Sequence, residues 1–374
     1  VLLLPAHVSF GGAISLADMA GRLNVITTKM DWNDRYNLWS GLIGGCFLAL
    51  AYFGTDQSQV QRYLTAKSIS ESRRGLLLNA VAKIPMQFFI LFIGAMVFVF
   101  YIYERPPLLF QQAELARITS PAVREGYAPI ESRYNSAFES RRAAADALLA
   151  ARSTGDTAEW NQEKAAYDRA QQDLDAARRE GAALAERSGG TRSSDTNFIF
   201  LTFVTQHLPA GLVGLVLAVI FGATMSAIAG ELNALASVSV VDIYKRHVRA
   251  GATDHHYLTA SRVATVFWGV YAVFSAHYAK GLGSLVEAVN VLGSLFYGGM
   301  LGVFVLAFGF PRVGPRAAFY SVLVGEAVIF ACWYFTGIAF LWYNVIGCGV
   351  VVATGLLISL VERPPVRAAS LDRG

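Results

Sequence analysis

The segment FGTDQSQVQRYLTAKSISESRRG, residues 53–75, is polar and basic but lies between two long apolar runs. The run before it covers residues 37–55, and the run after it covers residues 77–103. A helix needs about 20 apolar residues, at about 1.5 Å per residue, to cross the ~30 Å hydrocarbon core of a bilayer. Both runs reach roughly that length. The sequence therefore predicts that residues 53–75 connect two membrane-spanning helices.

The composition of the whole chain agrees with a membrane protein. Hydrophobic residues make up 54% of the 374 residues and charged residues only 16%, whereas soluble domains are about a quarter charged. The apolar runs predict full spans at residues 37–55, 77–103, 209–241, 261–279, 284–309, 317–336 and 339–361. Residues 1–10 are apolar but have no Met, basic region or cleavage site, so we expect further helices before them in a longer protein, not a signal peptide.

The distribution of basic residues between the predicted loops gives an orientation. Alternate loops carry the cations Arg62, Lys67, Arg73, Arg74, Lys245, Arg246, Arg249, Arg262, Arg312, Arg316, Arg363, Arg367 and Arg373. Because Lys and Arg concentrate in cytoplasmic loops, these loops and the tail at 362–374 are expected in the cytoplasm. We expect a multi-pass protein of the plasma membrane, in a bacterium the inner membrane. Topology accounts for the net charge of +4 without a nucleic-acid partner.

Residues 104–196 differ from the rest of the chain, being rich in Ala, Glu, Arg, Gln and Asp. Two blocks of this segment repeat larger side chains at heptad-like intervals, namely Tyr134, Phe138, Arg141, Ala145 and Leu148, then Trp160, Glu163, Tyr167, Ala170 and Leu174. This spacing predicts a helical hairpin that closes on one apolar seam. The orientation places it on the extracellular or periplasmic side. A lid, a docking module for an unknown partner and a tolerated spacer remain open as its role.

Polar side chains inside spans are candidates for a functional site, because each costs free energy in a bilayer unless it lies near a helix end. Those that stand out are Asp56, Gln57, Gln59, Gln61, Asn79, Lys83, Gln87, Ser226, Glu231, Asn233, Glu287 and Asn290. Glu231 is expected to be either paired or neutral. Its partner would be Lys83 or Arg62, whereas a neutral carboxyl could load and release a proton. Both interpretations stay open.

The sequence offers no basis for enzymatic chemistry. It has no metalloprotease-type His-Glu-x-x-His motif and no phosphate-binding loop. Its cysteines, Cys46, Cys332 and Cys348, lie inside predicted spans at no metal-binding spacing. We therefore expect a protein that is not an enzyme and needs no cofactor.

Three stretches carry a resemblance to a known family. The segment GTDQSQVQRYLTAKSISESRRG (54–75) resembles the signature of the sodium:solute symporter family, with its Gln-x-x-Gln-Arg-x-x-x-Ala-Lys-Ser pattern after a broken helix. AVIFGATMSAIAGELNALASVSVVDIYKR (218–246) is similar to the helix of that family that carries the sodium site. LGSLFYGGMLGVFVLAF (292–308) resembles the span that closes its core. The likeness covers the chain apart from 104–196.

This resemblance implies an all-α polytopic membrane protein with the leucine-transporter-like inverted repeat. The core would lack its first helices. Residues 1–103 would hold core helices five to seven, and residues 197–361 would hold core helices eight to ten with two further helices. Residues 104–196 would be an inserted extracellular helical hairpin, and residues 362–374 a cytoplasmic tail.

The resemblance also implies sodium-coupled symport of a small polar organic solute, such as a sugar, an amino acid or a carboxylate, by alternating access. It places Asp56, Lys83 and Asn290 in the solute site. Gln57, Gln87 and Glu287 are added to that site because they are polar residues in or at the ends of the predicted spans. The carbonyl of Ala223 and the hydroxyl of Ser226 would form one side of a sodium site. Independently of the resemblance, a pair of Glu231 with Lys83 or Arg62 would lock the inner gate of such a carrier. Ala227 stands where many members of the family carry a second hydroxyl. The loss of that oxygen ligand should weaken the sodium site.

Two alternatives remain from the sequence. Proton coupling is one, through Glu231. The other is a transporter-like membrane sensor, although only about a dozen residues follow the last predicted span and would not hold a signalling domain.

Overall fold

The structure is a computed structural model that describes residues 3–5, 8–24, 27–154, 157–190, 195–279 and 285–361. These residues form helices, together with an isolated bridge between Thr27 and Asn37. The predicted tail at 362–374, with Arg363, Arg367 and Arg373, lies outside the described residues. Residues 280–284, which belong to the short loop expected before the span at 284–309, also lie outside them.

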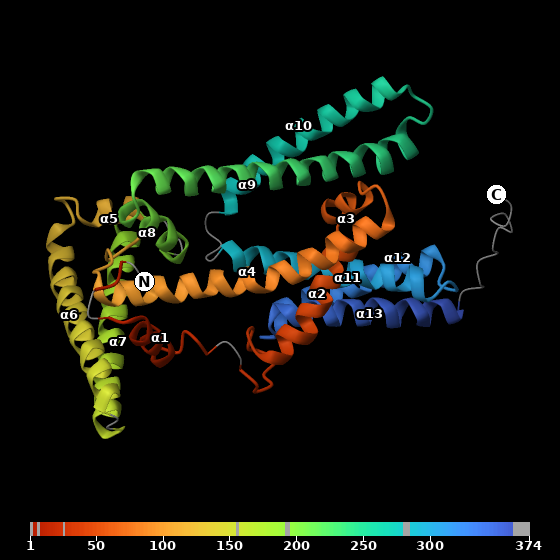
Figure 1. The fold of residues 1–374 in the computed structure, drawn as a ribbon. Helices are drawn as coiled ribbons and strands as arrows, with labels where there is room; N and C mark the ends of the chain where they lie inside the picture. Colours follow the sequence, from red (N-terminus) through yellow and green to blue (C-terminus); the bar gives the residue numbers. More distant parts are fainter. Residues whose placement is uncertain are drawn as a thin grey trace. The chain divides into compact units, whose positions relative to one another are not determined.

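The chain divides into two compact units, which we describe separately. The first unit consists of Val1–Val25, Arg74–Met225 and Ser275–Ser284, and the second of Ile26–Arg73, Ser226–Phe274 and Leu285–Gly374. Long helices pass from one unit into the other, because the boundaries fall inside α4, α9 and α10 (Figure 1).

The helices have the following bounds. The chain begins with α1 (Phe10–Met19), a π-helix (Ser40–Gly44), α2 (Gly45–Gly54), α3 (Gln57–Leu64) and α4 (Ile69–Tyr103). The central part contains α5 (Gln112–Ile118), α6 (Arg124–Thr154), α7 (Thr157–Arg187), a 3-10 helix (Asp195–Phe198) and α8 (Ile199–His207). The remainder contains α9 (Ala210–Ser237), a π-helix (Val238–Val248), α10 (Asp254–Ala279), α11 (Leu285–Gly309), α12 (Pro315–Phe335) and α13 (Phe340–Val361).

Five helical segments of the described chain are long and apolar enough to cross a membrane. They are Ile69–Tyr103, Ala210–Val248, Val286–Gly309, Pro315–Phe335 and Phe340–Val361. The predicted spans at 37–55 and 261–279 are not among them. The apolar helix Ser40–Gly54 is only about 22 Å long at 1.5 Å per residue. Residues 261–279 do form a helix within α10, but its Arg262, His277 and several Tyr, Trp and Ser residues dilute its apolar character.

The α4 helix begins before the apolar run at 77–103, so the connection between α3 and α4 is shorter than the sequence predicts. Ser68 Oγ accepts a hydrogen bond from the backbone N–H of Glu71 (3.2 Å), and the Glu71 carboxylate accepts one from the N–H of Lys67 (3.0 Å). This reciprocal arrangement resembles a capping box, which satisfies N–H groups that the first turn of a helix leaves free. The helix therefore begins at Ile69, eight residues before the predicted span, and continues through Pro85 to Tyr103.

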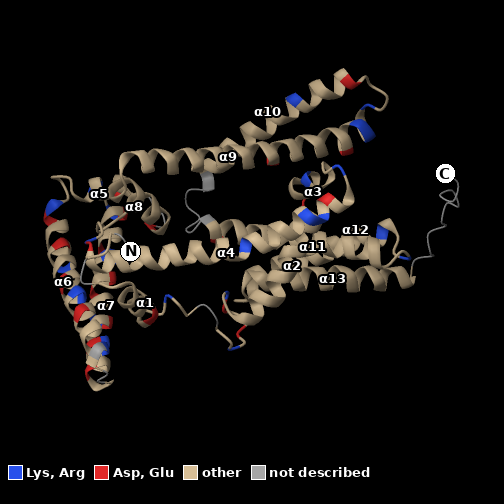
Figure 2. Ribbon diagram, in the orientation of Figure 1, with Lys and Arg blue, Asp and Glu red and all other residues tan. Residues whose placement is uncertain are grey.

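In the first unit, α6 and α7 pack against each other as an antiparallel pair of long helices (Figure 1). Most of the predicted seam is buried, namely Tyr134, Phe138, Arg141, Ala145, Leu148, Tyr167, Ala170 and Leu174. The predicted seam residues Trp160 and Glu163 are only half-buried. Figure 2 shows Lys, Arg, Asp and Glu along both helices and few of them along α9, α11 and α13. The Tyr134 hydroxyl donates to the carbonyl of Pro106 (2.9 Å), which fixes α6 to the segment that follows α4.

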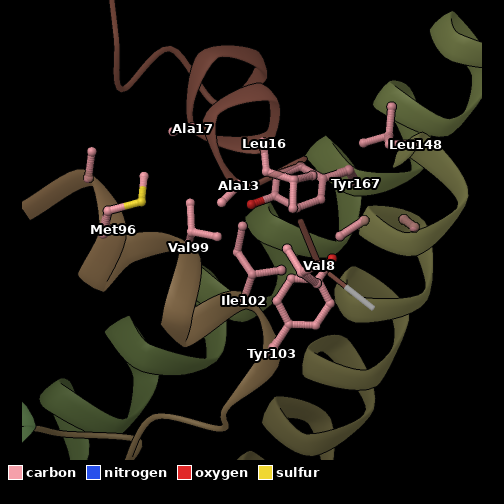
Figure 3. Close-up of a cluster of buried hydrophobic side chains, with 13 residues drawn as sticks. Val8, Ala13, Leu16, Ala17, Met96, Val99, Ile102, Tyr103, Leu148 and Tyr167 are labelled. Carbon is pink, nitrogen blue, oxygen red and sulfur yellow. The ribbon is translucent and has the colours of Figure 1, made fainter. Parts of the chain in front are cut away.

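An apolar cluster joins this hairpin to α1 and α4. Leu16 from α1, Val99 and Ile102 from α4, Leu148 from α6 and Tyr167 from α7 are each at most 2% exposed (Figure 3). Burial of a large apolar side chain contributes about 1.5–3 kcal/mol. The cluster therefore ties the hairpin to the end of α4 within the first unit.

In the second unit, α11, α12 and α13 pack closely through small residues. A Cβ atom added at Gly298 would lie 2.8 Å from the backbone oxygens of Tyr343 and Asn344 on α13. The Asn344 side chain is fully buried and donates to Ser294 Oγ on α11 (3.1 Å). Small residues and interhelical hydrogen bonds are the usual means by which helices associate in membranes.

Candidate functional site

The break between α2 and α3 is the first element of the candidate site. The α2 helix ends at Gly54, and Asp56 then adopts an extended conformation and accepts a hydrogen bond from the N–H of Ser58 (2.8 Å). Asp56 is thus the N-cap of α3, a favourable position for a carboxylate. Its side chain is half-buried, and Gln57 beside it is exposed. One oxygen of the predicted solute ligand Asp56 therefore already has a structural partner.

A pair of amides joins α3 to α9 within the second unit. Gln61 Nε2 donates to the carbonyl of Gly230 (3.2 Å), and Gln61 Oε1 accepts from Asn233 Nδ2 (3.3 Å). Arg62 lies against the same turn, since a Cβ at Gly230 would be 3.1 Å from its Nη2. The sequence marked Gln61 and Asn233 as unusual in a span but did not show that they meet, because they are far apart in the chain.

Glu231, the predicted gate residue, is exposed and forms no salt bridge with any residue that the structure describes. In the second unit Arg62 lies beside Gly230 and forms no ion pair with Glu231 among the described residues. Lys83 belongs to the other compact unit, so a pair with Lys83 stays a prediction. The α3 contact with α9 consists of the amides of Gln61 and Asn233 and of the Arg62 side chain beside Gly230. The role of Glu231 stays a prediction.

A cavity of about 340 Å³ lies between α2 and α11 in the second unit. Its polar lining consists of Asn290, Tyr52 and Tyr297, and small residues such as Gly45 leave the space open. Asn290 Nδ2 donates to the carbonyl of Val286 (2.9 Å), so its carbonyl oxygen can face a ligand. Asn290 was predicted in the solute site, whereas Tyr52 and Tyr297 were not. A hydroxyl-bearing aromatic beside small residues in an apolar helix is the sequence signal that could have indicated them.

Glu287 lies one turn before Asn290 in α11 and forms an ion pair with Arg35. Both side chains are partly exposed, at 34% and 48%. The predicted solute ligand Glu287 therefore holds a basic partner from the segment before α2. Arg35 was missed because its sequence context is an ordinary polar segment.

The remaining predicted residues lie on α4 and α9. Lys83 and Gln87 are exposed, one turn apart, on either side of Pro85. Ala223 and Ser226 are also exposed, and residues three apart lie on one face of a helix. Among the described residues the Ser226 hydroxyl has no hydrogen-bond partner, whereas the nearby Thr224 hydroxyl donates to the carbonyl of Ile220 (2.7 Å). Ser226 thus presents an uncommitted oxygen on the turn that also carries the Ala223 carbonyl.

The predicted site residues are divided between the two compact units. Asp56, Gln57, Ser226, Glu231, Glu287 and Asn290 belong to the second unit, and Lys83, Gln87 and Ala223 to the first. The structure brings Glu287 and Asn290 onto one turn, and Asp56 and Gln57 onto the start of α3. Within the described ranges, no group of three or more His, Cys, Asp and Glu side chains could hold a metal ion. Hydroxyl and carbonyl oxygens, which hard cations prefer, are what α9 supplies.

A comparison of Gln61 with Gln57 separates a structural amide from a predicted ligand on the same helix. Gln61→Ala removes two hydrogen bonds between α3 and α9, each worth about 0.5–1.5 kcal/mol. We expect a lower midpoint of thermal unfolding in detergent. Gln57→Ala, at an exposed position one turn earlier, should leave that midpoint unchanged. Equal midpoints for both variants would contradict the assigned role of Gln61.

Comparison with known proteins supports the family resemblance. The model of the "Sodium:solute symporter family" matches residues 179–325. The chain is 24% identical over 335 residues to the sodium/sialic acid symporter SiaT of Proteus mirabilis, covering 88% of this chain and 50% of the relative. It is 26% identical over 319 residues to the sodium/glucose cotransporter of Vibrio parahaemolyticus, covering 84% and 45%. The chain thus spans about half the length of these curated relatives.

A solved structure shares the fold. The substrate-bound outward-open state of a Na⁺-coupled sialic acid symporter matches with a TM-score of 0.57 and 21% identity, covering 95% of this chain and 60% of that one. The predicted fold class, an all-α polytopic membrane protein with a leucine-transporter-like core, is confirmed by this likeness and by the apolar helices. The status of residues 104–196 as an extracellular insertion stays a prediction.

Proposed function

We propose that this chain, a relative of the sodium:solute symporters, forms part of a sodium-coupled carrier for a small polar organic solute. The observation that carries the proposal is the face of α9 on which the uncommitted hydroxyl of Ser226 follows the Ala223 carbonyl by one turn. It lies in the stretch, residues 218–246, that resembles the sodium-site helix of the family. These two oxygens would supply part of a sodium shell, and other segments of the carrier would complete it.

The proposed solute class is supported by the chemistry of the predicted site residues and by the names of the relatives. Asp56, Gln57, Lys83, Gln87, Glu287 and Asn290 offer amide, carboxylate and ammonium groups, which suit a solute rich in hydroxyl or carboxylate groups. The cavity beside Asn290 adds the hydroxyls of Tyr52 and Tyr297. Relatives are named for transport of sialic acid, of glucose and, for a human protein 23% identical over 331 residues, of monocarboxylates. A sugar, an amino acid or a carboxylate is therefore the proposed cargo.

The proposed mechanism is alternating access, in which the binding of sodium and the binding of solute are thermodynamically linked. Sodium binds one arrangement of the helices more tightly than the other, and it therefore raises the population of the arrangement that it prefers. The free energy of this conformational equilibrium changes by at most the difference between the two binding free energies. If that arrangement also opens the solute site outwards, sodium raises solute affinity, and solute raises sodium affinity by the same factor. Glu231 is proposed at the inner gate, in a plasma-membrane protein with its basic loops in the cytoplasm.

Uptake into proteoliposomes tests this function. The full-length protein that contains this chain is reconstituted and offered radiolabelled sugars, amino acids and carboxylates. We expect an inward sodium gradient to raise uptake of at least one solute severalfold over a potassium gradient, and a sodium ionophore to abolish the difference. Uptake that follows a pH gradient and ignores sodium would establish proton coupling instead. No uptake of any solute by a correctly folded preparation would favour a sensor.

A further inference from the structure

A second cavity, of about 630 Å³, lies in the first compact unit, where the α6 and α7 hairpin meets the end of α4. It is separate from the cavity beside Asn290 and contains none of the predicted site residues. Ligand-binding pockets usually have volumes of about 300–1,000 Å³. The space is therefore large enough for a molecule of substantial size.

One wall of this cavity is apolar and belongs to a membrane-spanning segment. Phe88, Phe92 and Phe98 of α4 line it, and the rings of Phe88 and Phe92 are stacked with centroids 6.2 Å apart. Phe88 is 63% exposed in the described structure. Since α4 is apolar enough to cross a bilayer, this wall would face hydrocarbon chains.

The lining of this cavity also includes two buried donors that have no acceptor among the described residues. Arg141 is 4% exposed; its Nη1 donates to Gln171 Oε1 (3.0 Å) and its Nη2 to the carbonyl of Tyr101 (2.5 Å). Its Nε–H has no partner among the residues that the structure describes, and neither has the hydroxyl of Tyr101, a residue 7% exposed. A buried donor without an acceptor costs about 1–3 kcal/mol, more when it is charged. Both residues line the cavity.

The charges around the cavity are predominantly positive. Arg22 lies over the ring of Phe98, 4.5 Å from its centroid, and has no salt bridge within the described residues. Arg178 lies over Phe110 at 4.8 Å and is paired with Asp195 (2.6 Å). Asp175 is the carboxylate in the lining, and it accepts from Gln171 (3.0 Å).

The burial of Arg141 favours a negatively charged partner beside its guanidinium. It lowers the pKa of Arg141 from its usual value, yet a guanidinium remains protonated at neutral pH. Arg141 itself contacts a carbonyl and an amide but no carboxylate. An anion in the cavity would supply the missing charge and accept from Nε and from the Tyr101 hydroxyl.

We propose that this cavity binds an anionic amphiphile, specifically a phospholipid with a negatively charged head group. Its phosphate oxygens would lie near Arg22, Arg141 and the Tyr101 hydroxyl, while an acyl chain would lie along Phe88, Phe92 and Phe98. A polar transported solute has no use for the apolar wall, and a free inorganic anion would leave it unfilled. The inference is independent of the transport function.

Lipid binding to the purified full-length protein tests the proposal. The protein is delipidated in detergent and titrated with phosphatidylglycerol or phosphatidylcholine, and bound lipid is measured by native mass spectrometry. We expect phosphatidylglycerol to bind about tenfold more tightly. Arg22→Gln and Tyr101→Phe should each reduce that preference several-fold. Arg133→Gln is the matched control, because Arg133 lies on α6 in an exposed ion pair with Glu180 and outside the cavity.

The choice of variants keeps folding and binding apart. Arg141 is not substituted, because its bond to the Tyr101 carbonyl also supports the hairpin. Equal affinity for the two lipids, or a preference unchanged in both test variants, would overturn the proposal. Inorganic phosphate that competes as well as phosphatidylglycerol would also overturn it, because the apolar wall would then have no role. If oleate displaces phosphatidylglycerol, and if Tyr101→Phe weakens the binding of oleate, the cavity binds an anionic amphiphile as proposed. The bound amphiphile would then be a fatty acid.

Discussion

Gly298→Ala should strongly destabilise the membrane helices of the second unit. The added methyl would lie 2.8 Å from the backbone oxygens of Tyr343 and Asn344, closer than carbon and oxygen approach without repulsion. Because both atoms belong to the backbone of α13, no rotation of a side chain can relieve the contact. Overpacking of this kind costs about 1–3 kcal/mol. We expect a much lower yield of folded protein and an unfolding midpoint several degrees below that of the unsubstituted protein.

A matched control lies in the same bundle. Gly349 is an exposed glycine of α13 at which an added Cβ would meet nothing within 4 Å. Alanine is favoured over glycine in a helix by about 1 kcal/mol, so Gly349→Ala should be as stable as the original protein or slightly more stable. Both variants receive the same gain in helix propensity, and their difference therefore measures the interhelical contact. Equal midpoints would show that α11 and α13 do not approach so closely at Gly298.

The same glycine shows what the sequence could and could not predict. A glycine in an apolar helix indicates a close approach, but it does not name the partner. Gly298 meets Tyr343 and Asn344, and that pairing depends on how α11 and α13 pack. The hairpin seam was more predictable, because Tyr134, Phe138 and Leu148 recur at helical spacing and such periodicity alone defines a buried face.

Boundaries and polar partners were less predictable than the existence of the helices. The apolar run at 37–55 does not reveal that the helix ends at Gly54 and that Asp56 caps a new one. In the candidate site, Asn290 was identified from its polarity within a span. Tyr52 and Tyr297 were missed because the sequence does not show which side chains line a cavity, and Arg35 because it lies in an ordinary polar segment far along the chain from its partner Glu287. The two unsatisfied donors beside the hairpin become visible only when burial is known.

Ser226→Ala should raise the sodium concentration that half-saturates uptake by about tenfold or more. The hydroxyl of Ser226 has no partner within the described chain and is the side-chain oxygen that α9 offers beside the Ala223 carbonyl. An interaction with a charged group is worth about 1.5–3 kcal/mol, and 1.4 kcal/mol is a factor of ten in affinity. The substitution is at an exposed helical position where alanine is favoured, so folding should be unaffected. Initial rates of uptake at varied sodium and saturating solute measure the effect.

Two further substitutions on the same helix make this test specific. Thr224→Val removes a hydroxyl that already donates to the Ile220 carbonyl and lies about 200° around the helix from Ser226, so it should leave the sodium dependence unchanged. Ala227→Ser adds a hydroxyl beside Ser226 and should lower the half-saturating sodium concentration several-fold, because it supplies a further oxygen for the ion. If Ser226→Ala and Thr224→Val shift the sodium dependence equally, or Ala227→Ser leaves it unchanged, the sodium ligands do not lie on this face of α9. A proton-coupled carrier would show no sodium dependence in any of the three variants, and its response to a pH gradient would then identify the coupling ion.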